Sequence, residues 1–169
     1  MNRHIAYLKV VLRHKWFVFL ACRRLGVPLW IALVHDWRKF LPRQWFPYAR
    51  NFYEPDGTKR PGNRADSGDK SFQLAWLDHQ RARHHWQAWC VIEDAENGAA
   101  VLTLLEIPEV YLREMLADWM GAGLAYDSYK PHEWWTSHRR QICMNEKSKK
   151  LLAEILEYEV PRKFVGGGK

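Results

Sequence analysis

Cysteine is scarce in this sequence, with three copies at Cys22, Cys90 and Cys143. The number is odd, the positions are far apart and no C-x-x-C pair occurs, which excludes a disulfide framework and a cysteine-based zinc knuckle. Unpaired thiols are typical of a reducing compartment. We therefore predict a cytoplasmic protein.

Long hydrophobic runs are also missing. The most apolar region, residues 16–34, is interrupted by Arg23 and Arg24, whereas a bilayer-spanning helix needs about 20 predominantly apolar residues. Residues 1–9 lack the apolar stretch and the small-residue cleavage site of a secretory signal. The sequence therefore predicts no membrane partner.

Acidic residues are outnumbered by basic ones, with 19 Asp and Glu against 26 Lys and Arg and a formal net charge of +7. A basic protein attracts anionic partners such as nucleotides or nucleic acid, without choosing among them. The chain has 169 residues, of which 47% are hydrophobic, enough for one core without disulfides. We predict a single domain over residues 1–165 and a short flexible tail at 166–169.

Apolar residues recur at helical spacing through most of the chain, and glycine and proline interrupt them. The predicted helices cover residues 5–25, 29–40, 45–52, 72–81, 108–120, 132–142 and 145–158. Two short β-patterned segments, 89–92 and 101–105, flank the turn formers Asn97 and Gly98. The predicted fold class is therefore all-α with one small β-hairpin.

Residues 54–71 consist of turn formers and charged side chains. A structureless segment longer than about 12–15 residues is usually a mobile functional loop or a disordered one. We expect a flexible polar loop here, close to the entrance of a binding pocket.

The first predicted helix carries apolar residues that suggest one buried stripe, made of Leu8, Val11, Leu12, Phe19 and Leu20. His14 lies three residues after Val11 and seven after Tyr7, so these three side chains share a helical face. We expect His14 to point inward.

Histidine is abundant, with eight copies, and several lie at or beside predicted helices together with acidic residues. The candidate metal ligands are His14, His35, Asp36, His79, His84, His85 and Asp118. Imidazole and carboxylate together suit a divalent ion such as Mn, Fe, Co, Ni, Zn or Mg. The sequence therefore predicts a divalent metal cofactor, with one or two ions.

His35 and Asp36 are neighbours in the predicted second helix, about 100° apart around its axis, so both can reach one ion at its edge. Lys39 lies one turn further on the same side. Its ammonium can offset negative charge on a phosphate or carboxylate held at the ion. The alternative is a solvated lysine that stabilises the end of the helix.

The order of these residues resembles the HD superfamily of metal-dependent phosphohydrolases. His14 comes first, His35 and Asp36 follow in an H-D-x-x-K context with Lys39, and histidines and a later aspartate complete the set. Across residues 5–158 the motifs RHKWF, VHDWRKF, WLDHQ, RHHW and EMLADW also resemble an uncharacterised family of phage and bacterial proteins. A phage-encoded member would work in the host cytoplasm.

The HD resemblance implies that His14, His35, Asp36 and Asp118 hold a first metal. It further implies that Asp36 bridges to a second ion held by His79 with His84, His85 or both. Unlike dinuclear relatives, this chain places these histidines close together, which requires it to leave the helix after His79.

The same resemblance implies an enzyme that hydrolyses a phosphate monoester or diester of a nucleotide-like molecule, through metal-activated water. Asp36 and Lys39 are its expected catalytic residues. The substrate-binding candidates are Lys39, Arg81, Arg83 and Trp86.

Other interpretations remain open for several of these residues. His84 and His85 beside Arg81, Arg83 and Trp86 also fit a basic aromatic surface that stacks on bases. Asp118 can instead pair with an arginine, and Glu114 can support a ligand or be an ordinary exposed acid.

The sequence contains ten tryptophans. We expect most of them to be buried in the core. Trp37, Trp86 and Trp119 each follow a candidate ligand, and they could wall a pocket for a nucleobase.

Two alternative functions use the same residues. One is an HD-type diiron oxygenase, because histidine and carboxylate also bind iron. The other is a nucleic-acid or protein-binding module with a structural metal site, in which the basic charge contacts phosphates.

Overall fold

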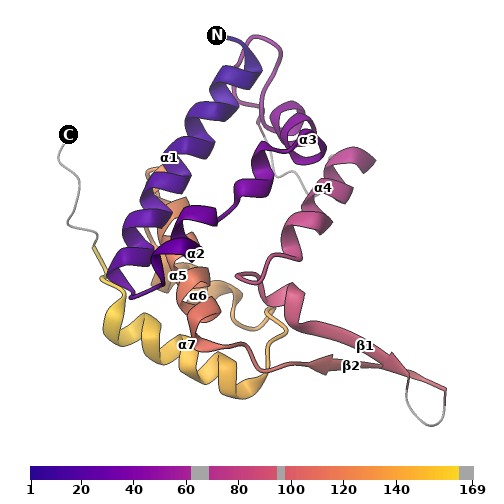
Figure 1. Ribbon diagram of the computed structural model, residues 1–169, viewed down its shortest axis with the longest axis vertical. Helices are drawn as coiled ribbons and strands as arrows, with labels where there is room; N and C mark the ends of the chain where they lie inside the picture. The colour runs from indigo at the N-terminus through magenta and orange to yellow at the C-terminus, as the bar shows by residue number, and fades with distance from the viewer. Residues whose placement is uncertain (62–68, 95–97, 164–169) are drawn as a thin grey trace.

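Helices make up most of the computed structural model, which describes residues 1–61, 69–94 and 98–163. These residues form seven α-helices and one two-stranded antiparallel sheet (Figure 1). The prediction of an all-α fold with one small β-hairpin is confirmed. The predicted tail at 166–169 and the part of the predicted loop at 62–68 lie outside the described residues.

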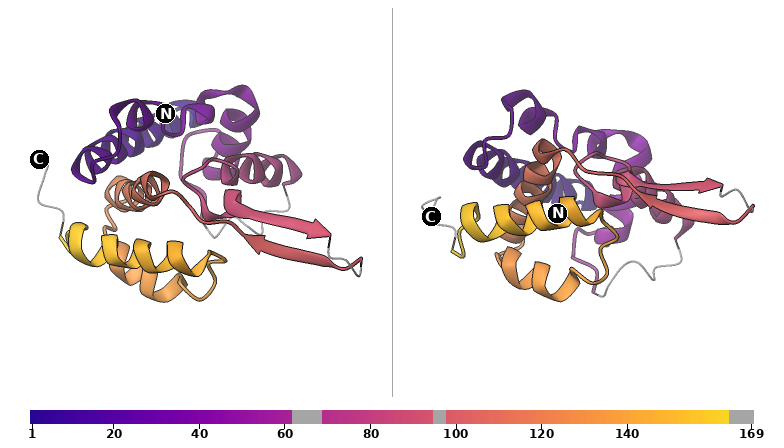
Figure 2. Two further views of the ribbon diagram at one scale, coloured as in Figure 1. Left: turned by 60° about the horizontal axis from the view of Figure 1, so that its bottom comes forward. Right: turned by 90° about the horizontal axis from the view of Figure 1, so that it is seen from below.

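The described residues form a series of helices interrupted once by the two strands. The α-helices are α1 (Arg3–Arg24), α2 (Leu29–Val34), α3 (Pro42–Phe52), α4 (Lys70–Gln80), α5 (Glu109–Ala125), α6 (Pro131–His138) and α7 (Glu146–Glu159). The 3-10 helices η1 (Trp37–Phe40) and η3 (Trp86–Trp89) follow α2 and α4. The strands β1 (Cys90–Asp94) and β2 (Ala100–Leu104) pair with Ile92 opposite Leu102, and they project away from the helices (Figure 2).

The helices α1 and α5 pack along each other at the centre of the fold (Figure 1). Gly121 lies at their contact, where a Cβ would come within 2.3 Å of Cγ2 of Val18. The sequence predicts a helix over residues 108–120 that ends before Gly121, and this end is wrong, because α5 continues to Ala125. Glycine here permits close approach of two helices, and it does not act as a cap.

The buried side of α1 differs in part from the predicted stripe. Val11 is buried, as predicted, but Leu8 and Leu12 are exposed. The buried side instead includes Tyr7 and His14. Both sides of α1 carry apolar residues, so periodicity alone did not identify the side that faces α5.

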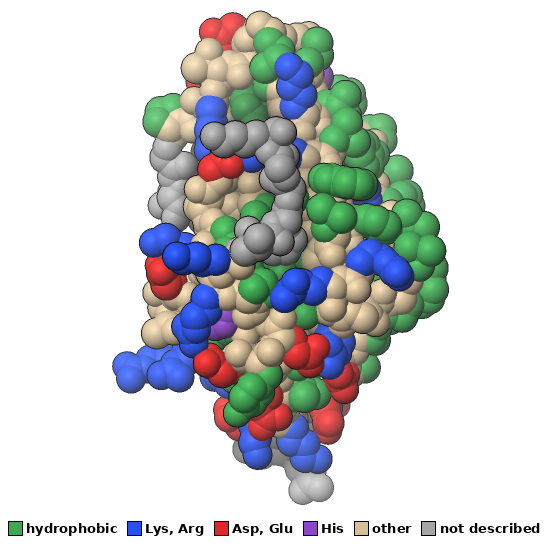
Figure 3. Space-filling view, turned by 90° about the vertical axis from the view of Figure 1, so that its left-hand side faces the viewer, with side chains coloured by type: hydrophobic (Ala, Val, Ile, Leu, Met, Phe, Trp, Pro, Cys, Tyr) green, Lys and Arg blue, Asp and Glu red, His purple; other side chains and the backbone are tan. Residues whose placement is uncertain are grey.

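Tryptophan is mostly a surface or half-buried residue in this fold, so the prediction of mainly core tryptophans is wrong. Trp135 is the buried one, and five others are exposed: Trp16, Trp30, Trp37, Trp76 and Trp134. Hydrophobic side chains gather along one side of the face shown in Figure 3. A large aromatic side chain such as tryptophan is buried only where a neighbouring element packs over the ring.

Two groups of buried residues flank the space between α1, α4 and α5. The larger core surrounds α5 and includes Val18, Leu112 and Leu152. The smaller core is mainly aromatic, with Tyr7, Tyr48 and Phe72 contributed by α1, α3 and α4.

Among the described residues, no helix combines the length and the apolar character that crossing a membrane requires.

Candidate metal centre

Four candidate ligands from three separate parts of the chain meet at one point. His14 comes from α1, His35 and Asp36 follow α2, and Asp118 comes from α5. Nε2 of His14 lies 3.1 Å from Oδ1 of Asp118, and Nε2 of His35 lies 3.4 Å from the same oxygen. One ligand atom from each residue lies within 4.8 Å of the others, close enough to share an ion.

The chain breaks its helix at His35 and Asp36. α2 ends at Val34, and Asp36 takes the left-handed conformation with a φ of 55° before η1 begins. The prediction that both residues lie in one helix is therefore wrong. Left-handed backbone is uncommon for a residue other than glycine and is often found at functional sites.

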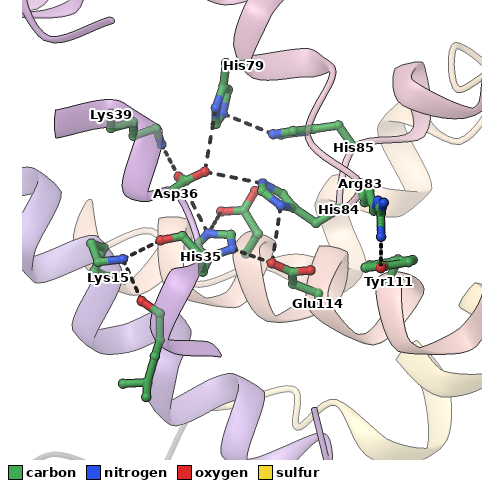
Figure 4. Close-up of polar contacts among 12 residues, drawn as sticks. Lys15, His35, Asp36, Lys39, His79, Arg83, His84, His85, Tyr111 and Glu114 are labelled. Carbon is green, nitrogen blue, oxygen red and sulfur yellow. Dashed lines mark hydrogen bonds and ion pairs between the residues drawn. The ribbon is translucent and has the colours of Figure 1, made fainter. Parts of the chain in front are cut away.

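Lys15 supports this break from α1. Its ammonium donates hydrogen bonds to the backbone carbonyls of Leu33, at 3.4 Å, and of His35 (Figure 4). These are carbonyl groups at the end of α2, which has no further turn to satisfy them. Lys15 therefore helps to hold the turn that presents His35 and Asp36, a role that the sequence analysis missed.

Three further histidines form a second group on the other side of Asp36. His79 lies near the end of α4, and His84 and His85 lie in the turn after it, so the chain leaves the helix between them as their spacing requires. Oδ1 of Asp36 lies 3.6 Å from Nδ1 of His79 and 3.4 Å from Nε2 of His84. Nε2 of His79 and Nε2 of His85 are 3.0 Å apart. The Asp36 carboxylate thus faces both groups (Figure 4).

Glu114 is a buried acid behind the histidines, one turn before Asp118 on α5. Its Oε1 lies 2.9 Å from Nδ1 of His35 and 3.3 Å from Nδ1 of His84. A carboxylate on one ring nitrogen orients the imidazole and leaves the other nitrogen for a metal. In the sequence, the position of Glu114 four residues before Asp118 indicates this supporting role. The alternative interpretation, an ordinary exposed acid, is wrong because Glu114 is buried.

Five buried atoms at the centre make no hydrogen bond of acceptable geometry within the described part of the chain. They are Nε2 of His14, His35 and His84 and both carboxylate oxygens of Asp36. Their contacts are ion pairs, with Nζ of Lys39 2.5 Å from Oδ2 of Asp36 and Nε2 of His84 3.4 Å from Oδ1. A divalent cation fits these atoms, because it accepts lone pairs from imidazole nitrogen and carboxylate oxygen together.

The acids of the centre are ionised. Burial raises the pKa of Asp36, but the positive charges of Lys39 and His35 outweigh burial and hold that pKa well below its ordinary value. Burial likewise raises the pKa of Asp118, and the contacts with His14 and His35 reverse the shift. Both acids therefore offer negative oxygens to a cation.

The histidines of the second group differ in charge. Burial lowers the pKa of His79 well below its usual value and that of His85 to about 4, so both rings are neutral at pH 7. Burial also lowers the pKa of His84, but the contacts with Asp36 and Glu114 outweigh it and raise the pKa to about 10. Without a metal, His84 therefore carries a proton.

The predicted substrate-binding residues lie around the centre but do not share one cavity. Lys39 lines a cavity of about 460 Å³ on the side of His14 and His85. Arg81 and Arg83 line a cavity of about 370 Å³. Trp86 lines a third cavity, also of about 370 Å³.

Lys39 contacts the centre directly. Its Nζ lies 2.5 Å from Oδ2 of Asp36, and its side chain is largely buried. The ammonium therefore belongs to the site, in contrast to the alternative of a solvated lysine at a helix end. Arg83 donates a hydrogen bond to the hydroxyl of Tyr111 at 2.8 Å (Figure 4).

Residues 3–158 match the sequence profile of a family of unknown function, DUF5662. The chain belongs to this family. The DUF5662 match includes all seven candidate ligands and Glu114. No curated protein and no solved structure matches the chain.

Proposed function

We propose that this DUF5662 protein is a metal-dependent hydrolase of phosphate esters, with nucleotide-like substrates. The observation that carries the proposal is the convergence of five buried ligand atoms on His14, His35, Asp36 and His84, whose contacts within the described residues are ion pairs without hydrogen-bond geometry. They are the atoms that a divalent cation would bind.

The donor set limits the class of metal. Histidine nitrogen and carboxylate oxygen without thiolate suit Mn, Fe, Co, Ni, Zn or Mg. Asp36 directs one oxygen at each of the two histidine groups, an arrangement that supports two ions bridged by this carboxylate. One ion on His14, His35, Asp36 and Asp118 is the simpler form of the proposal.

A bound divalent ion would acidify a water molecule and supply positive charge for phosphoryl oxygens. The chain contributes Lys39 to the same chemistry. The Lys39 ammonium lies 2.5 Å from Oδ2 of Asp36, and it would be repelled by a cation that Asp36 helped to hold. Lys39 also lines the largest of the three cavities, so it can turn towards a phosphate there. The order of the ligands, which resembles the HD superfamily, supports the same activity.

We also propose a reducing compartment and an anionic small-molecule partner for this chain. Cys22, Cys90 and Cys143 are all free thiols, which supports a reducing compartment such as the cytoplasm. The net charge of +7 supports capture of an anionic small molecule. Nucleic acid is the alternative anionic partner.

The test is a hydrolysis screen with defined metals. Protein purified without chelator or histidine tag is analysed for metal and then loaded in turn with Mn, Co, Ni, Zn and Mg. Nucleoside monophosphates and triphosphates, cyclic mononucleotides and cyclic oligonucleotides are the substrates. We expect phosphate ester cleavage with at least one metal and none with the Asp36→Asn variant.

Two results would contradict the proposal. Metal that is bound while every substrate stays intact would favour the binding module. Two redox-active irons in the purified protein, with oxygen consumption in place of hydrolysis, would favour the oxygenase, because the same ligands suit iron.

A further inference from the structure

The cavity of about 460 Å³ that Lys39 lines is bounded by α1, α3, α4 and α5. Its wall includes candidate ligands from both groups: His14, His79, His85 and Asp118. A molecule in this cavity would therefore touch the metal centre. The cavity is also lined by two tyrosines that are not among the candidate metal ligands.

Tyr7 from α1 and Tyr48 from α3 are each 4% exposed. Their hydroxyl groups make no hydrogen bond within the described residues, although both side chains line the cavity. Aromatic neighbours hold the rings: the Tyr7 ring centroid lies 4.8 Å from that of Trp45, and the Tyr48 centroid lies 5.2 Å from that of Phe72. The hydroxyls are thus fixed by packing and not by a polar partner.

Both hydroxyls are neutral donors. Burial raises the pKa of Tyr7 and Tyr48 above the ordinary value, and the negative charge of Asp36 raises each further. A donor that is shielded from water and pre-positioned favours an acceptor with negative charge, because such hydrogen bonds are the strong ones. Lys59 adds a positive charge at the same cavity, with its Nζ 5.2 Å from the centre of the Tyr126 ring.

The other two cavities lack this pattern. The cavity of Arg81 is also lined by His35, Asp36 and His84, but their atoms without a hydrogen bond are those assigned above to the metal. Outside that set, the buried side-chain atom without a hydrogen bond is the amide oxygen of Gln44 in the cavity of Arg81, and the amide oxygen of Gln87 in the cavity of Trp86. The Gln44 amide nitrogen donates to Asp78 at 2.6 Å, which fixes its oxygen as the free end. An acceptor repels a phosphate oxygen, whereas the two tyrosine hydroxyls attract it.

We infer that this cavity binds the phosphate group of the substrate, with Tyr7 and Tyr48 donating hydrogen bonds to its oxygens. The inference rests on the proposed function, from which it takes the phosphate ester. The remaining wall includes Phe52, Trp76 and Tyr126, which favours an ester whose organic part is aromatic, such as a nucleoside phosphate, over a sugar phosphate.

The test measures binding and not turnover. Phenylphosphonate carries a phosphonate on an aromatic ring and has no ester bond to hydrolyse, and methylphosphonate is its counterpart without the ring. Each is titrated by calorimetry into chelator-treated protein and into manganese-loaded protein. The variants are Tyr7→Phe and Tyr48→Phe, with Tyr158→Phe as the control because Tyr158 is 85% exposed on α7.

We expect phenylphosphonate to bind more tightly than methylphosphonate. Loss of one hydrogen bond to a charged group should weaken phenylphosphonate binding about tenfold in Tyr7→Phe and in Tyr48→Phe. Tyr158→Phe should bind as the wild type does. The Tm of both cavity variants should stay the same or rise, because the removed hydroxyl has no partner in the fold.

A purely structural role for the tyrosines would leave phenylphosphonate affinity unchanged in both variants, and that result would overturn the inference. Failure of the wild type to bind either phosphonate would overturn it as well. Tyrosine-dependent binding together with no hydrolysis of any ester would support the cavity and count against the proposed function alone.

Discussion

The carboxylate of Glu114 accepts a hydrogen bond from Nδ1 of His35, and the two atoms are 2.9 Å apart. Because this bond holds a proton on Nδ1, Nε2 is the ring nitrogen of His35 that is left for a cation. The same oxygen of Glu114 lies 3.3 Å from Nδ1 of His84. One buried acid therefore orients two candidate ligands from different parts of the chain.

Glu114→Gln should weaken metal binding about 10-fold to 100-fold, as is usual when a group behind a ligand is replaced. The amide keeps the size of the side chain but loses the charge that holds both rings. The dissociation constant for manganese, measured by competition with a chelator, checks this. Glu154→Gln, at an exposed position of α7, should leave the constant unchanged. Equal dissociation constants for manganese in Glu114→Gln and Glu154→Gln would show that Glu114 does not support the metal ligands.

Asp36→Asn should abolish metal binding while the chain keeps its helical circular dichroism. The asparagine tolerates the left-handed backbone but offers no negative oxygen to a cation. Asp127 supplies a matched control, because it has the same φ of 55° and lies exposed in an ion pair with Arg13. Asp127→Asn should retain the full metal content by elemental analysis. Metal retained in Asp36→Asn would reject the central role of this carboxylate.

Much of the site was predictable from spacing, and the reasons for the exceptions are local. The helical face shared by Tyr7, Val11 and His14 correctly placed His14 inward. The break at Asp36 was not predictable, because residues 29–40 are compatible with a continuous helix and the left-handed turn depends on Lys15, which is distant in sequence.

Burial was harder to predict than secondary structure. Trp16 and Trp30 are apolar enough for a core, yet they are exposed, because α1 and α2 turn another side towards the rest of the fold. Glu114 shows the opposite case, since a charged residue is buried where two imidazoles satisfy it. Sequence pattern gives the period of an element, but the packing partner decides which side is covered.

The metal-free protein should lose stability as the pH rises above about 6.5. The pKa of His84 is about 10 in the folded chain and about 6.5 in an unfolded one. Below pH 6.5 both states carry the proton and the ion pairs of His84 stabilise the fold fully. Between pH 6.5 and 10 the unfolded chain releases the proton while the folded chain retains it, so the free energy of unfolding falls.

Urea unfolding with chelator present, at a series of pH values from 6.5 to 9, measures this effect. His84→Gln should reduce the dependence of the free energy of unfolding on pH, although His35, whose pKa is also raised, keeps part of it. His138→Gln should leave this dependence as it is in the wild type. A wild-type protein with constant stability across this range would show that His84 is not held protonated by Asp36 and Glu114.

Lys39→Met should lower kcat by about tenfold or more and largely preserve the metal content. Its ammonium lies 2.5 Å from Oδ2 of Asp36, but a cation at that oxygen would displace it, so coordination does not depend on the lysine. Its proposed effect is on negative charge that develops in the transition state, which a preorganised cation stabilises. Methionine keeps most of the length and apolar volume of the side chain, so the fold should tolerate it.

Steady-state kinetics on the best substrate of the screen, with metal analysis of the same sample, gives both quantities. Loss of metal from Lys39→Met would instead show that Lys39 organises the ligands, and an unchanged kcat would exclude it from the chemistry.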